Sequence, residues 1–148
     1  ASDRAGAHMG WAMLCEGRGR YQDAIEAYET AILTEPEMTG PRTNLASMLE
    51  RVLQQTAPEQ RAALMQRVGQ LRKDELPLIA RDAALASENA GIQYRYGLAL
   101  YLAGEIDKAL EQLQLAVKLA PDVADFQQAR DLLLQRINQD RKQESTPP

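Results

Sequence analysis

The stretch GRYQDAIEAYETAILTEP, residues 19–36, is matched without a gap by GEIDKALEQLQLAVKLAP, residues 104–121. In both blocks two alanines flank a larger side chain, at the aligned positions Ala24 and Ala109, Tyr28 and Leu113, and Ala31 and Ala116. These positions are spaced by whole helical turns, so they lie on one face of a helix. The pattern predicts two equivalent helices, each packed closely on one neighbour and ended by a proline.

A second set of small residues extends the repeat. Ala12, Ala46 and Gly97 each occupy the eighth position of a predicted first helix, and the steps between them are 34 and 51 residues. This pattern resembles the tetratricopeptide repeat, whose period is about 34 residues. The resemblance covers most of residues 5–136 and implies three units at about 5–38, 39–89 and 90–123. The middle unit then carries an insertion of about 17 residues.

Composition favours helices along the whole chain. Aliphatic residues and Ala dominate, and no stretch alternates apolar and polar residues long enough for a sheet. We expect an all-α fold, a TPR-like right-handed superhelix of three antiparallel helix pairs with a capping helix at 122–138. Residues 1–138 would form this single array. Residues 139–148 are polar, end in two prolines and are expected to be disordered.

The insertion is the most individual part of the chain. Thr56 to Glu59 fit a capping box, which predicts that a helix begins near residue 57 after a helix at about 41–55. Pro77 lies inside the helical pattern that follows, so we expect a kink or break between Lys73 and Pro77. The insertion is either a lengthened unit that packs on itself or an arm at 56–76 that contacts a partner.

Charge and motifs exclude several functions. The net charge of −4 disfavours nucleic acid, and no apolar segment is long enough to span a membrane. The single histidine, His8, and the single cysteine, Cys15, both fall at core positions of the repeat. No nucleotide-binding, zinc-protease or haem-attachment motif is present. We therefore expect no enzyme activity, no metal and no cofactor.

The resemblance also implies where a ligand binds. In tetratricopeptide repeats the first helices line a concave groove, chiefly through positions 2, 5, 9, 12 and 13 of each unit. Carried over, with Arg95 added beside Tyr94, this selects Met9, Met13, Glu16, Thr43, Ser47, Glu50, Arg51, Tyr94, Arg95, Leu98, Tyr101 and Leu102. The same side chains can also serve packing alone, and the sequence leaves both interpretations open. Met9 and Met13 replace the Lys and Asn with which some relatives grip chaperone C-termini, so we expect no such clamp.

The function predicted from these features is recognition of a protein or peptide in the groove. Self-association is an alternative, because no cap precedes the first helix, which we expect to expose part of Trp11. A third hypothesis follows from the strings PRTNLA, residues 41–46, and QYRYGLALY, residues 93–101, which also resemble the repeat tails of bacterial multihaem c-type cytochrome-like proteins. The chain begins at Ala1 without Met and would then be an excised docking tail. We expect a soluble protein of the cytoplasm or the periplasm.

Overall fold

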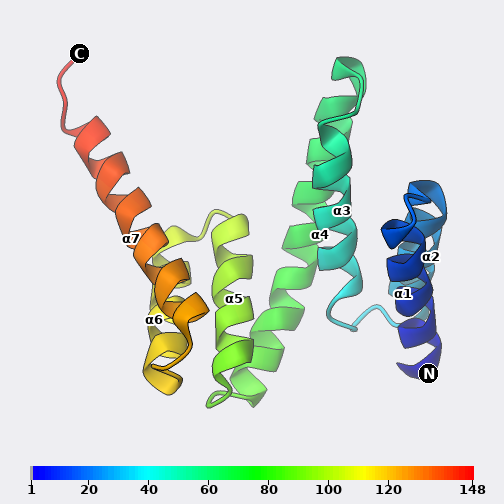
Figure 1. Cartoon of the computed structure of the whole chain (residues 1–148), viewed down its shortest axis with the longest axis horizontal. Coiled ribbons are helices and arrows are strands. Elements are labelled where there is room, and N and C mark those ends of the chain that lie inside the picture. Colours follow the sequence, from blue (N-terminus) through cyan, green and yellow to red (C-terminus); the bar gives the residue numbers. More distant parts are fainter. Residues whose placement is uncertain (1) are drawn as a thin grey trace. The chain divides into compact units, whose positions relative to one another are not determined.

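The computed structural model describes residues 2–148, with side chains from Arg4 onward. Within these residues the chain forms seven α-helices, coloured along the sequence in Figure 1. Their bounds are α1 Ser2–Gly17, α2 Tyr21–Thr34, α3 Pro41–Leu53, α4 Pro58–Leu85, α5 Ala90–Leu102, α6 Ile106–Leu119 and α7 Ala124–Glu144. The prediction of an all-α fold is confirmed for the described residues.

The helices pack with their sequence neighbours in two compact units, Ala1–Leu78 and Ile79–Pro148. In the first unit α1 packs on α2 and α2 on α3, and Val68 of α4 joins the same core cluster as Leu45 and Leu49 of α3. In the second unit α5 packs on α6 and α6 on α7. The single array and the right-handed superhelix over both units stay predictions.

The two aligned blocks begin with the same turn. Gly19 and Gly104 have φ angles of 74° and 84°, which glycine adopts without a steric penalty. In each turn the residue after the glycine donates its N–H five residues back, from Arg20 to Cys15 and from Glu105 to Leu100, at 2.9 Å. This bond pattern ends α1 and α5 as a Schellman motif and starts the antiparallel helix.

The aligned small–large–small positions form the two cores. All six side chains of the set, Ala24, Tyr28, Ala31, Ala109, Leu113 and Ala116, are buried. The approach is closest at Gly97, where an added Cβ would lie 2.9 Å from Leu113 Cδ2 and 3.3 Å from its backbone nitrogen. Only a residue without a Cβ therefore allows α5 to pack on α6 at this distance.

Two features of the insertion differ from the prediction. Thr56 does not cap α4, because its hydroxyl donates to the Val52 carbonyl, 2.9 Å away, and closes the end of α3. Of the kink or break expected between Lys73 and Pro77, the break is absent, since α4 is one helix from Pro58 to Leu85, and the kink stays a prediction. A proline removes one backbone hydrogen bond, but buried contacts hold α4 before and after it, at Glu75 and Ala83.

The last helix also differs from the prediction. The capping helix was expected at 122–138, with disorder from residue 139, but α7 runs from Ala124 to Glu144. The additional turns contain Gln139, Arg141, Lys142 and Gln143, which are good helix formers. The Arg136–Asp140 pair, four residues apart, also supports this part of the helix.

The Gly97 contact predicts a test of the packing. Gly97→Ala should lower the free energy of unfolding by about 1–3 kcal/mol, because the new Cβ forces Leu113 and the α6 backbone apart. Gly69→Ala in α4 is the matched control, since no neighbouring element lies within 4 Å of its Cβ position. It should raise stability by up to about 1 kcal/mol. Urea unfolding measures both, and equal effects of the two substitutions would contradict the close approach.

Candidate functional site

The predicted groove residues of the first unit divide into framework and exposed surface. Met13 is 52% exposed, and Ser47 and Arg51 are also exposed. The other predicted residues of this unit, Met9, Glu16, Thr43 and Glu50, make contacts that hold the helices together, as described below. Met13 and Ser47 thus face outward, whereas Glu50 and Arg51 are exposed side chains that each form an ion pair with another helix.

Glu16 joins three helices. Tyr28 of α2 donates its hydroxyl to Glu16 Oε2 at 2.7 Å, and the guanidinium of Arg51 from α3 forms an ion pair with Oε1. Burial raises the pKa of the Tyr28 hydroxyl, so it stays protonated and keeps donating. The Arg51 guanidinium is therefore exposed, but its ion pair with the Glu16 carboxylate holds it in place.

Thr43 is engaged at the start of α3 by Glu75. The Glu75 carboxylate, 1% exposed, accepts the N–H groups of Gly40 and Thr43 at 2.7 Å each, and also the Thr43 hydroxyl. Burial raises the pKa of this carboxyl, while the backbone hydrogen bonds and the Arg42 charge lower it. Glu75 therefore caps a helix that begins more than thirty residues earlier in the chain.

Met9 and Glu50 also belong to the framework. The Met9 side chain packs against the core and fills the space beside Gly40, where an added Cβ would lie 3.3 Å from its sulfur. Glu50 accepts from Arg72 of α4 at 2.6 Å and partly compensates the charge of that buried guanidinium. Both side chains fix neighbouring helices, which a ligand contact would have to disturb.

In the second unit Tyr94 serves packing. Its ring stacks on Phe126 of α7, with the ring centroids 4.5 Å apart and the planes at 29°. The contact holds α5 against α7 and covers one face of the Tyr94 ring. Arg95 beside it is exposed and forms no hydrogen bond or ion pair with any described residue.

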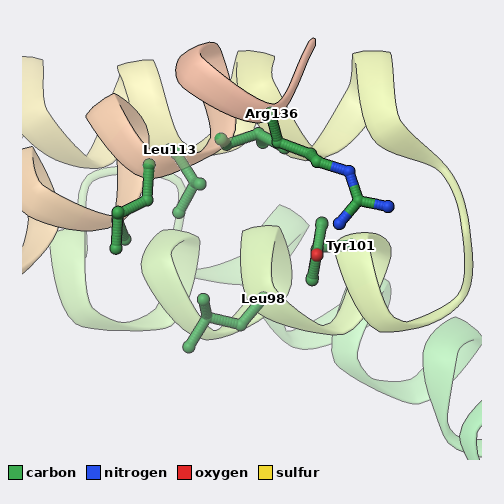
Figure 2. A pocket seen from close by; sticks show the side chains of 7 residues that line it. Leu98, Tyr101, Leu113 and Arg136 are labelled. Atoms are coloured by element: carbon green, nitrogen blue, oxygen red, sulfur yellow. The ribbon is translucent and has the colours of Figure 1, made fainter. Parts of the chain in front are cut away.

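Two other predicted residues of this unit, Leu98 and Tyr101, line a pocket of about 270 Å³ (Figure 2). Three helices build it: Leu98 and Tyr101 come from α5, Leu113 from α6, and Ala129, Leu132, Leu133 and Arg136 from α7. Figure 2 shows the Arg136 guanidinium reaching toward the Tyr101 end of the pocket. The sequence pattern selected the α5 side of this pocket. It missed the α7 side, because the repeat scheme treats that helix only as a cap.

Other kinds of site have little support in the described residues. Among the side chains that the structure describes, from Arg4 to Pro148, no group of three or more His, Cys, Asp or Glu is placed to hold a metal ion. In the same part of the chain no helix combines the length and the hydropathy needed to cross a membrane. His8 is half-buried and Cys15 is buried in the core.

Comparison with known proteins agrees with this architecture. Residues 90–123 match the family model described as tetratricopeptide repeat, so this part of the chain is a tetratricopeptide repeat, as predicted. A solved structure described as the first TPR of Spaghetti (RPAP3) bound to the HSP90 peptide SRMEEVD has the same fold. Its TM-score is 0.58 at 18% identity, over 93% of this chain and 96% of that one.

Other matches are more distant. MamA 41-end from Desulfovibrio magneticus RS-1 aligns with a TM-score of 0.45 and 20% identity, over 92% of this chain and 86% of that one. MamA of AMB-1 aligns with a TM-score of 0.44 and 18% identity, over 96% of this chain and 87% of that one. No curated protein sequence matches the chain.

The buried carboxylate gives a prediction for the first unit. Glu75→Ala should lower the free energy of unfolding by about 1–3 kcal/mol, because the two N–H groups and the Thr43 hydroxyl lose their acceptor. The neighbouring Asp74→Ala is the control: Asp74 is exposed and bonds only Gln70 within its own helix. That substitution should stay within about 0.5 kcal/mol of the parent.

The same pair of proteins tests the pKa shift of Glu75. A raised pKa means that the native state binds the proton more tightly than the unfolded state does. The stability difference between the parent and Glu75→Ala should therefore be largest below the ordinary carboxyl pKa and fall as the pH rises through the folded-state pKa. Thermal unfolding at a series of pH values measures it, and a difference that grows with pH would show a lowered pKa instead.

Proposed function

We propose that this chain is a protein-interaction module that binds a polypeptide segment on the exposed faces of its first helices. The observation that carries the proposal is the division of the predicted groove positions: some build a fixed framework, and the rest present apolar and cationic groups outward. A framework fixed before binding reduces the entropy lost on association. The likeness to a TPR structure described with a bound peptide supports the same general role.

The first unit offers an apolar and a charged contact side by side. Met13 of α1 is unbranched and adapts to irregular partners. Ser47 and Arg51 lie one turn apart on α3, and Glu16 holds the Arg51 guanidinium in place while leaving it exposed. Such a surface suits an extended segment that carries both an apolar side chain and a hydrogen-bond acceptor.

The peptide in the RPAP3 structure is a property of that protein. In this chain Met9 and Met13 occupy the positions where the family's chaperone clamp has Lys and Asn, and Met9 packs into the core. We therefore propose that this chain does not hold its partner through that clamp.

Self-association is the second candidate, because α1 exposes an apolar edge. Trp11 is 49% exposed and Leu14 is 61% exposed, three residues apart on one face. The Arg20 guanidinium lies 5.9 Å from the Trp11 ring centroid and covers only part of this surface. A second copy of the chain would bury the edge. The role of a docking tail in a larger multihaem protein stays a prediction, as does the absence of enzyme activity.

A selection experiment tests the proposed function. The chain is immobilised and used to select from a display library of random dodecapeptides, and the affinity of the enriched peptides is measured by calorimetry. Met13→Ala should weaken binding of those peptides that contact the first unit by about tenfold, the usual cost of losing a well-packed interface side chain. Leu14→Ala, also exposed on α1 but not at a groove position, should leave their affinities unchanged.

Two outcomes would count against peptide binding. A selection that enriches no peptide over an empty support would contradict it directly. Binding lost in Leu14→Ala but kept in Met13→Ala would place the contact on the apolar edge. Sedimentation at several concentrations then tests the second candidate, which predicts dimers that weaken in the Leu14→Ala variant.

A further inference from the structure

The pocket of the second unit has a size and lining that suit one side chain. Its volume of about 270 Å³ lies just below the range of about 300–1,000 Å³ found for small-molecule sites. Leucines from α5, α6 and α7 form most of the wall, and Arg136 is the single charged lining residue. Such a lining offers few polar groups to orient a cofactor, but it can bury an aliphatic group.

The walls of this pocket are fixed by contacts outside it. The stacking of Tyr94 on Phe126 ties α5 to α7, and the close approach of Gly97 to Leu113 sets the distance between α5 and α6. At the mouth Tyr101 is 39% exposed and Leu132 is 59% exposed. The pocket is thus formed in the free protein and keeps apolar surface in contact with water, which a bound side chain would cover.

The charges beside the pocket favour an acidic ligand. Arg136 bonds Asp140 through Nε only, at 3.2 and 3.3 Å, in a pair that is largely exposed and therefore weak. Its terminal nitrogens reach toward Tyr101, as Figure 2 shows, and bond no described residue. Arg95 is the only charged residue of α5 and has no described partner, so this helix presents no acidic group to repel a carboxylate.

We propose that this pocket binds a Leu or Met side chain of a partner peptide and that Arg136 binds a carboxylate directly following that residue. The inference rests on the proposed function and specifies its ligand in the second unit. The aliphatic group fills the space between Leu98, Leu113 and Leu133. The acidic side chain pairs with the Arg136 guanidinium at the mouth, where the Tyr101 hydroxyl supplies a further donor.

The test compares selected peptides on three proteins. The display selection is run on the parent chain, on Arg136→Gln and on Tyr101→Ala, with Arg141→Gln and Leu102→Ala as controls. The controls carry the same change in charge or the loss of an exposed apolar side chain on the same helices, outside the pocket. Circular dichroism and the melting temperature confirm that each variant is folded.

The parent and both controls should enrich peptides in which Leu or Met precedes Asp or Glu. Arg136→Gln should weaken these peptides by about two- to fivefold, as expected for an ion pair at an exposed site, and should remove the preference for the acid. Tyr101→Ala should weaken them to a similar degree. Fluorescence anisotropy with three synthetic octapeptides, centred on Leu-Asp-Asp, Ala-Asp-Asp and Leu-Lys-Lys, gives the affinities.

The outcomes separate this inference from the proposed function. Peptides that are enriched without the motif, or that bind Arg136→Gln and Tyr101→Ala as tightly as the parent, would overturn the inference and leave peptide binding intact. A selection that enriches no peptide would overturn both. Equal affinity for the Leu-Asp-Asp and Leu-Lys-Lys peptides would exclude Arg136 as the group that binds the carboxylate.

Discussion

The structure depends on the close approach of paired helices at small residues. Gly97 leaves so little room beside Leu113 that one added carbon would lie 2.9 Å from its side chain and 3.3 Å from its backbone nitrogen. In each unit, buried alanines flank the larger residue of the aligned set, Tyr28 in α2 and Leu113 in α6. Dense packing of this kind fixes the distance between helices, because a buried side chain such as Leu113 has little free space into which it can move. The distance between α5 and α6 also affects the width of the pocket in the second unit. Leu113 contacts Gly97 and is at the same time part of the pocket wall.

The buried positions that recur in both aligned blocks could be predicted from the sequence, whereas contacts made by single residues outside the repeat pattern could not. Ala24, Tyr28 and Ala31 recur as Ala109, Leu113 and Ala116, so their burial could be predicted by aligning two blocks. Glu75 could not be found in this way, because its partners, Gly40 and Thr43, lie far away in the chain and a lone Glu on a helix carries no local signal. Pro77 favours a helix break, which the buried contacts of Glu75 and Ala83 oppose. The Thr56 hydroxyl bonds the Val52 carbonyl four residues back instead of capping α4.

The candidate site shows the same division. Position numbers in the repeat selected Leu98 and Tyr101, which line the pocket, but they could not separate side chains that support the framework from those that stay exposed. Tyr94 stacks on Phe126, Glu16 accepts a hydrogen bond from Tyr28, and Thr43 donates to Glu75. None of these three partners occupies a groove position. The contribution of α7 was missed because the helix was interpreted as a cover, whereas its Leu132, Leu133 and Arg136 form one side of the pocket.

The central claim is that groove-side residues, and not the exposed edge of α1, contact a partner peptide. The most direct measurement is an NMR titration of the isotopically labelled chain with an enriched peptide, following backbone amide shifts and the side-chain methyl groups. The account predicts that the largest changes fall on Leu98, Leu113 and Leu133 around the pocket. Changes confined to Trp11 and Leu14, or to the turn between α3 and α4, would contradict it.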